Sequence, residues 1–334
     1  MLNEALKKVV GGGTLTETES AAMVNAIAEG ENPVAAAGLL TALSMRGETV
    51  PEMTGAANFL RDHMIAVSAG DCADIVGTGG DGGKSFNIST AASLVAAGAG
   101  VRMAKHGNRA VSGKCGAADV LSELGFNLLV APERMEYSIQ THGIGFLFAP
   151  VMHPMLGKVA ALRRELGFRT IFNMLGPLCN PAGASGIVLG VYDPALCELF
   201  AETLRELGVR RAMVVAGHDG LDEISCSVST RVAELDSGVI RCYELFPELL
   251  LGETFSPSEI AGGDAEANAA RLLAVLQGKD QGAARAIVLL NAGAAIRVAG
   301  LAEDLRDGMA IAAESIDSGA ALGKLDALIR ESCR

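Results

Sequence analysis

The chain has 334 residues, a formal net charge of −12 and a pI near 5.0, and half of its residues are hydrophobic. This composition supports a buried core in one large domain or two, and it lacks the overall basic field that nucleic acid or an anionic membrane would require. The seven cysteines are scattered without a CxxC pair, so neither a disulfide framework nor a zinc site is indicated. With no export signal visible at the N-terminus, we expect a cytoplasmic location.

The first part of the chain, residues 1–68, is predicted to be entirely helical. Thr16 and Glu19 form a capping-box pattern before residues 21–28. Pro33 and Pro51 each stand at the start of a further helical pattern, at 34–45 and 52–67. Since no strand pattern interrupts these segments, we predict a small helical domain.

From residue 71 the pattern changes to short β-type runs that alternate with helical segments. The runs lie at 73–76, 187–191 and 212–216, and residues 194–207 form one of the intervening helices. Such alternation predicts an α/β domain, residues 69–334, around a central parallel or mixed sheet. The uncharged run 170–192 contains prolines, asparagines and glycines that would break a lipid-facing helix, so it is interpreted as a buried loop and strand.

Several other segments are predicted to be helical. An arginine-rich helix at 151–168 is expected to pack back on the N-terminal helices, so that residues from about 151–175 join the small domain. The chain is expected to end in helices, at 265–277, 283–299 and 301–330.

Two motifs after the first strand are typical of phosphate sites. The turn GTGGD, Gly77 to Asp81, comes directly after the run 73–76, where open α/β sheets bind ligands and glycine allows close approach of phosphate. Asn87, Ser89 and Thr90 precede an alanine-rich helix and are natural cap residues at an end that attracts anions. A tight structural turn is the plain alternative for the glycines.

A basic segment follows these motifs. KHGNR, Lys105 to Arg109, is interpreted as a loop that carries two permanent positive charges and one titratable group. Solvated surface is the usual explanation of such a segment, but apolar runs bound this one. A ligand with two separate phosphate groups would suit all three elements, so the sequence predicts a pocket for a phosphorylated sugar.

Two nucleotide-binding patterns fit the glycine turn less well. Gly77, Gly79 and Gly82 spell GxGxxG, but the acidic residue expected about 20 positions later is replaced by Arg102 and Lys105, so an NAD site is disfavoured and an NADP site stays open. Thr78 stands where a P-loop needs its first glycine, and this excludes that motif.

Further along the chain, Asp222 and Glu223 follow the strand at 212–216. Adjacent carboxylates near a phosphate site suggest magnesium, although a solvated acidic turn is the alternative. Arg163, Arg164 and Arg169 are either a helix surface or a source of one guanidinium that grips a carboxylate. His63, His142 and His153 have no partner at ligand spacing, and no general base is assigned. The pattern therefore favours catalysis by positioning and electrostatics.

Several long motifs in this order resemble anthranilate phosphoribosyltransferase. They are DIVGTGGDGGKSFNISTAA, KHGNRAVSGKCGAADVL, MHP, RRELGFRTIFNMLGPLCNPAG and DGLDEIS, and the likeness covers nearly the whole chain. The resemblance implies a nucleoside phosphorylase/phosphoribosyltransferase-like fold and a homodimer joined through the helical part. It implies transfer of phosphoribosyl from phosphoribosyl pyrophosphate to the amine of anthranilate in tryptophan biosynthesis, with no nucleic acid or membrane as partner.

The resemblance also implies the site residues. The phosphoribosyl pyrophosphate would be held by Gly77, Gly80, Asp81, Ser85, Asn87, Ile88, Ser89, Thr90, Lys105, His106, Gly107, Asn108, Arg109, Ala110, Val111, Ser112 and Gly113. Anthranilate would meet Gly77, Asn108 and Arg163. Magnesium, two ions per subunit, would be held by Ser89, Asp222 and Glu223.

Two stretches depart from the family pattern. Gly113, Cys115 and Ala117 stand where further serines are common, so some hydroxyl contacts to phosphate are absent or supplied by backbone. Met155-Leu156-Gly157 follows the MHP motif in place of the usual residues, which puts acceptor preference in doubt. The alternative functions are a pyrimidine nucleoside phosphorylase, a nucleic-acid-binding relative without transferase activity, and an NADP oxidoreductase.

Overall fold

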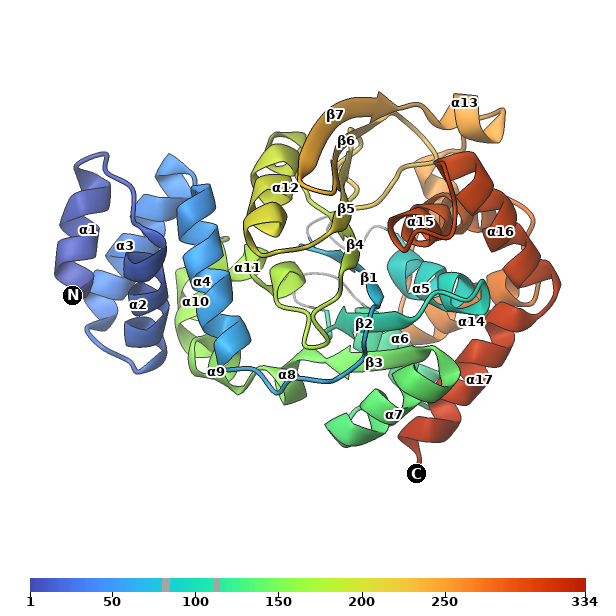
Figure 1. The fold of residues 1–334 in the computed structure, drawn as a ribbon, viewed down its shortest axis with the longest axis horizontal. Coiled ribbons are helices and arrows are strands. Elements are labelled where there is room, and N and C mark those ends of the chain that lie inside the picture. The colour runs from blue at the N-terminus through green and yellow to red at the C-terminus, as the bar shows by residue number, and fades with distance from the viewer. Residues whose placement is uncertain (80–84, 111–114) are drawn as a thin grey trace.

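The computed structural model describes residues 1–79, 85–110 and 115–334. A bundle of N-terminal helices lies at one end of the molecule, and a twisted sheet with helices on both faces forms the rest (Figure 1). The predicted combination of a helical part with an α/β part is confirmed. No helix formed by the described residues is long and apolar enough to cross a membrane.

The N-terminal helices begin where their cap residues predict. Thr16 Oγ1 accepts a hydrogen bond from Glu19 N, and Glu19 Oε2 accepts one from Thr16 N, which completes the capping box. Pro33 opens its helix behind Asn32, whose side chain accepts from Ala35 N. The bounds are α1 Leu2–Val10, α2 Glu17–Ala28, α3 Pro33–Arg46 and α4 Val50–Asp62.

The last of these helices ends earlier than predicted. Helix α4 stops at Asp62 instead of 67, because the amides of Ile65 and Val67 donate to the carbonyls of Met152 and Pro181. These bonds hold the chain in an extended link toward the sheet, so the helical pattern cannot continue.

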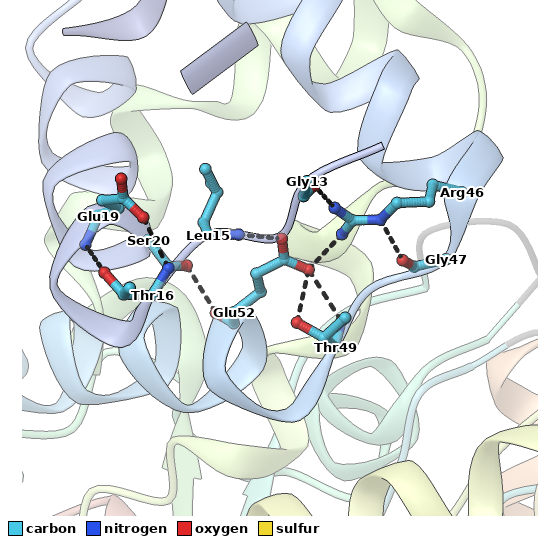
Figure 2. A network of polar contacts seen from close by, with 9 residues as sticks. All are labelled: Gly13, Leu15, Thr16, Glu19, Ser20, Arg46, Gly47, Thr49 and Glu52. Atoms are coloured by element: carbon cyan, nitrogen blue, oxygen red, sulfur yellow. Dashed lines mark hydrogen bonds and ion pairs between the residues drawn. The ribbon is translucent and has the colours of Figure 1, made fainter. Parts of the chain in front are cut away.

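A buried carboxylate ties the helical bundle together. Glu52 is fully buried on α4; its Oε1 accepts from Leu15 N at 2.8 Å and its Oε2 accepts from Thr49 N at 2.9 Å (Figure 2). Arg46, at the end of α3, forms an ion pair with the same Oε2 and also donates to Gly13 O. Glu52 therefore joins α3, α4 and the α1–α2 connection at a single point.

Within the described residues the sheet has seven strands in the order β3-β2-β1-β4-β5-β6-β7. The first five strands pair in parallel, whereas β6 pairs antiparallel with β5 and β7 antiparallel with β6, so the sheet is mixed. The bounds are β1 Ala73–Gly77, β2 Met103–Gly107, β3 Ile144–Phe148, β4 Gly186–Gly190, β5 Arg211–Gly217, β6 Thr230–Asp236 and β7 Val239–Leu245. The predicted runs at 73–76, 187–191 and 212–216 correspond to β1, β4 and β5.

Long helices cover the two faces of the sheet. Helices α5 and α15 pack on one face, against β1 and its neighbours, while α12 contacts β5 and β6 on the side of the helical bundle (Figure 1). The longer helices of this unit are α5 Ile88–Gly98, α6 Ala117–Glu123, α7 Pro132–His142, α12 Cys197–Glu206, α14 Ala265–Leu276, α15 Ala283–Val298, α16 Leu305–Asp317 and α17 Ala320–Ser332. The predicted segment 301–330 is thus two helices, separated at Gly319 by a left-handed turn.

The arginine-rich segment is not the single helix predicted at 151–168. It is broken at His153, whose φ of −124° and ψ of 73° are not helical and which precedes Pro154. The pieces contact α2 and α3, in agreement with the expected direction of packing. The short helices are α8 Ala149–Met152, α9 Pro154–Lys158, α10 Ala160–Leu166, α11 Ile171–Met174 and α13 Pro247–Leu251, with 3-10 turns η1 Gly176–Leu178, η2 Pro194–Leu196 and η3 Pro257–Ile260.

Candidate active site

The glycine turn that follows β1 at Gly77 and the acidic turn that carries Asp222 and Glu223 meet at one edge of the sheet. Strands β1 and β4 end side by side at Gly77 and Gly190, and a Cβ at Gly190 would lie 1.6 Å from the main-chain oxygen of Asp222. Gly79, with φ of +68°, donates its N–H to Asp222 Oδ2 at 2.9 Å. Glycine at these positions therefore lets the acidic turn lie directly against the strand ends.

Hydrogen bonds from several elements fix the acidic turn. Asp219 accepts from Leu221 N and from Ser225 Oγ, so the turn is closed by its own side chains. Asn291, buried on α15, accepts from Ile224 N and donates to Ile224 O. Asp222 and Glu223 thus stand on a braced support, as a metal-binding pair needs.

No side chain among the described residues caps the start of α5, which the sequence did not indicate. Asn87 occupies the N-cap position, but its side chain does not cap the helix, because it donates to Cys115 O and accepts from Asn268 Nδ2. The predicted capping by Asn87 is therefore wrong. Ser89 and Thr90 lie in the first turn, where amides without an internal partner favour an anion.

Two buried hydroxyls near this edge have no hydrogen-bond partner among the described residues. They are Thr78 Oγ1, in the glycine turn, and Thr90 Oγ1, in the first turn of α5. A buried hydroxyl left without a partner costs stability, so such groups are expected where a ligand binds. In the sequence Thr78 is only a mismatch to the P-loop motif, and no pattern around it indicates a binding role.

The first three residues of the basic segment form a strand. Lys105, His106 and Gly107 end β2, so the predicted loop begins only at Asn108. Lys105 is buried, and its Nζ donates to Ile75 O at 2.6 Å and to His106 O at 3.3 Å. Burial lowers the pKa of Lys105, and the nearby charges of Asp74, Glu223 and Asp222 oppose that shift. Lys105 is thus a buried amino group whose charged form the carboxylates of Asp74, Glu223 and Asp222 favour.

Arg109 is paired with an acidic residue of α6. Its Nη1 lies 2.7 Å from Asp119 Oδ1, and the other carboxylate oxygen of Asp119 accepts from Ala110 N and Gly116 N. Asn108 Oδ1 accepts from Arg109 N. Asp119 therefore folds this loop and offsets part of the positive charge that the sequence suggested.

A pair of buried histidines was missed in the sequence. The rings of His106 and His153 are 4.9 Å apart, and both ring nitrogens of His153 lack a hydrogen-bond partner among the described residues. Burial lowers the pKa of His106 well below its usual value and that of His153 to about 4, so both rings are neutral at pH 7. The two residues are far apart in the sequence, and only the fold brings them together.

The lowered pKa of His153 predicts that the stability of the folded protein depends on pH. In the unfolded chain His153 takes up a proton below pH 6.5, whereas in the folded protein it stays neutral until about pH 4. The unfolded state binds more protons in that window, so we expect the free energy of unfolding to fall by roughly 3 kcal/mol as the pH drops through it. Urea midpoints at pH 7.5 and pH 5 should differ less in His153→Leu than in the wild type; equal differences would contradict this.

Arg163 lies on α10 with its side chain half-buried. Burial lowers its pKa, and none of the ion pairs between described residues involves Arg163. Arg169 instead stacks on Tyr192 at 4.0 Å, and Arg164 is exposed. Of the three arginines, Arg163 is the one whose charge is both partly desolvated and available to a carboxylate ligand.

The acidic turn offers magnesium two protein carboxylates and not a complete set of protein ligands. Among the described residues no group of three or more His, Cys, Asp or Glu is arranged to hold a metal. Magnesium commonly takes one or two protein carboxylates and completes its shell with waters and substrate phosphates. Asp222 and Glu223 fit that pattern, and Ser89, the third predicted ligand, lies in the first turn of α5. Five predicted site residues lie outside the described residues: Gly80, Asp81, Val111, Ser112 and Gly113.

Comparison with known proteins agrees with this architecture along the whole chain. Residues 69–322 match the family model "Glycosyl transferase family, a/b domain", and residues 3–64 match "Glycosyl transferase family, helical bundle domain". The anthranilate phosphoribosyltransferase of Desulfatibacillum aliphaticivorans is 52% identical over 333 residues, covering 99% of this chain and 98% of the relative.

Solved structures give the same result. The crystal structure of anthranilate phosphoribosyltransferase from Thermus thermophilus is 43% identical, with a TM-score of 0.93 over 99% of both chains. The Saccharomyces cerevisiae enzyme in complex with phosphoribosyl pyrophosphate and magnesium is 28% identical, with a TM-score of 0.89 over 99% of this chain and 98% of the yeast chain. Its complex with 4-fluoroanthranilate has a TM-score of 0.88 at the same identity, over 99% and 97%. The chain therefore belongs to the anthranilate phosphoribosyltransferase family.

Proposed function

We propose that this protein transfers the phosphoribosyl group of phosphoribosyl pyrophosphate to the amine of anthranilate, giving N-(5-phosphoribosyl)anthranilate and pyrophosphate in tryptophan biosynthesis (EC 2.4.2.18). The observation that carries the proposal is the contact between Asp222 and the turn Gly77–Gly79, which places carboxylates beside a phosphate-type turn at the strand ends. The yeast relatives that bind phosphoribosyl pyrophosphate with magnesium, and 4-fluoroanthranilate, support it.

Each described element would contribute a separate interaction. The open start of α5 and the amides near Gly77 would bind phosphate oxygens, and Asn108 with its neighbours would hold the other end of the sugar phosphate. Asp222 and Glu223, with Ser89, would hold magnesium. Arg163 would form a charge-assisted pair with the anthranilate carboxylate. His106 and His153 would both be neutral and would add no charge at the end of β2.

The reaction needs positioning more than proton transfer. As pyrophosphate leaves C1 of the ribose, negative charge builds on the leaving group and positive charge on the sugar; bound magnesium would stabilise the former. Lys105, close to Asp222 and Glu223, would add positive charge on the same side. The aromatic amine is neutral at pH 7 and can attack from the opposite face, so no general base is assigned; the proton that nitrogen loses once the N–C1 bond has formed can pass to the departing pyrophosphate or to water.

Anthranilate fluorescence offers a direct test, since the chain contains no tryptophan to interfere. The purified protein is mixed with anthranilate, phosphoribosyl pyrophosphate and magnesium, and again with a chelator in place of the metal. We expect fluorescence to fall only with magnesium, with pyrophosphate released in equal amount. No loss under either condition would overturn the proposal; thymidine or uridine phosphorolysis would then be measured.

Arg163→Ala should weaken the use of anthranilate selectively. Loss of one charge-assisted pair is worth about 1.5–3 kcal/mol, so the KM for anthranilate should rise roughly 10- to 150-fold. The KM for phosphoribosyl pyrophosphate should stay near that of the wild type. Arg164→Ala, which removes the adjacent exposed arginine, is the matched control and should change neither constant. Equal weakening toward both substrates would contradict the assignment.

The proposal also covers the oligomeric state, the number of magnesium ions, the location and the division into domains. We infer a homodimer joined through the helical part, two magnesium ions per subunit, and a cytoplasmic location. Residues 1–68, joined by the helices of about 151–175, would form one domain and residues 69–334 the other. Light scattering on the purified chain tests the dimer, and a mass near that of one chain would contradict it.

A further inference from the structure

The sheet is split between β1 and β2. Strand β1 pairs with β4 over five residues and β2 with β3 over five, but β1 and β2 are in register at a single pair, Ala73 with Met103. Beyond that pair the two strands belong to separate halves of the sheet. The split runs toward the edge where β1 ends in the Gly77 turn and β2 ends before Asn108.

Side chains fill the split in place of the main-chain ladder. Asp74, fully buried on β1, accepts from His106 N at 3.2 Å and from Asn180 Nδ2 at 2.7 Å. The same Asn180 Nδ2 donates to Ala104 O at 2.8 Å, and Asn180 Oδ1 accepts from Ala182 N. From the β2 side, Lys105 Nζ reaches Ile75 O. Apart from the bond to Ala182 N, which holds Asn180 within its own segment, each of these bonds joins β1 to β2, directly or through Asn180.

A buried carboxylate is an expensive way to join two strands. A plain β ladder would satisfy the same main-chain groups without removing a charge from water. What the side chains provide is a connection in which a carboxylate and an amide, in place of direct main-chain bonds, fix how β1 and β2 lie relative to each other. The spacing between the Gly77–Gly79 turn and the segment from His106 to Ala110 then depends on Asp74.

We propose that Asp74 is a positioning residue for the transferase reaction: with Asn180 it sets the separation of β1 and β2, and so the distance between the two elements that grip the phosphoribosyl ligand. This inference rests on the proposed function. Asp74 itself lies in the strand interior, below the ends that would touch substrate, and acts through His106 and the main chain of β2.

The hydrogen bonds specify a set of variants. In Asp74→Asn the new amide must turn its NH₂ toward either His106 N or Asn180 Nδ2, both of which are donors, so one bond is lost. Asn180→Asp places two carboxylates against each other. The double exchange Asp74→Asn/Asn180→Asp restores both contacts. In it the amide introduced on β1 accepts from His106 N through its oxygen and donates to the carboxylate introduced at position 180, but that carboxylate now sets an acceptor against Ala104 O, so the exchange restores only part of the network.

We expect each single variant to lower kcat/KM for phosphoribosyl pyrophosphate at least tenfold, and the double exchange to recover part of that loss, because it regains both contacts of position 74 but sets two acceptors against each other at Ala104 O. Glu52→Gln is the matched control: it also alters a buried carboxylate and should lower the melting temperature, but it lies in the helical bundle and should leave kcat/KM unchanged. Wild-type constants in folded Asp74→Asn, or a loss in the double exchange equal to the product of the two single losses, would overturn the proposal.

Hydrogen exchange separates this proposal from the proposed function. Without any substrate, peptides covering residues 103–110 should exchange faster in Asp74→Asn than in the wild type, while peptides from β4 stay protected. Unchanged exchange at 103–110 would overturn the positioning role. If the wild-type protein showed no transferase turnover, the proposed function would be wrong. The exchange measurement would still show whether Asp74 holds β2 in place.

Discussion

Changing the acidic pair to amides, Asp222→Asn/Glu223→Gln, should lower magnesium-dependent kcat/KM by about 10²–10³-fold, the scale at which loss of an electrostatic contact to developing charge is usually felt. The physical reason is that the amides keep the shape of the turn, including an oxygen that can accept from Gly79 N, but no longer bring negative charge to a cation. The measurement is the rate of anthranilate fluorescence loss over a series of magnesium concentrations. Part of the lost activity should return at high magnesium.

A charge-matched variant makes this result specific. Glu303→Gln/Asp326→Asn removes two negative charges from exposed positions and should leave the magnesium dependence as it is in the wild type. Equal melting temperatures for both double variants would show that the acidic turn, which Asp219 and Asn291 brace independently, remains folded. Undiminished magnesium-dependent turnover in Asp222→Asn/Glu223→Gln would remove the metal role from this pair.

Local signals in the sequence predicted the parts of the fold that local interactions determine. The Thr16–Glu19 capping box and Pro33 act within one helical turn, and the structure places both at helix starts. The runs that became β1, β4 and β5 are largely apolar, as buried parallel strands are. The β6–β7 hairpin was missed, although Ser237 and Gly238, both with positive φ, are typical of a two-residue hairpin turn.

The features of the candidate site that the sequence did not predict depend on contacts between distant segments. Lys105 and His106 are polar, so β2 did not resemble a buried strand; their burial depends on Asp74, Asn180 and His153, which come from distant segments. Asn87 was predicted as a capping residue because nothing nearby in the sequence shows that Cys115 and Asn268 take its side chain. The glycine turn and the acidic turn, in contrast, both follow strands, and parallel strand ends share one edge.

In the helical bundle, Glu52→Ala should lower the free energy of unfolding by about 3–5 kcal/mol, the cost of removing one partner from a buried ion pair. Glu52 is the common acceptor for Leu15 N, for the main-chain N and the hydroxyl of Thr49 and for the Arg46 guanidinium, so its loss leaves four donors without this partner, the Leu15 amide among them in the buried interior (Figure 2). Urea unfolding followed by far-UV circular dichroism measures the change.

The exposed ion pair between Glu29 and Lys158 provides the comparison. Its atoms are 2.8 Å apart, as close as those of many buried pairs, but both side chains are about half exposed. Water solvates both charges whether or not they meet, so Glu29→Ala should leave the urea midpoint nearly unchanged. If both alanine variants shifted the midpoint equally, burial would not be the cause. A large shift for Glu52→Ala alone would show that the burial of its contacts, and not the presence of an ion pair as such, makes this carboxylate necessary to the bundle.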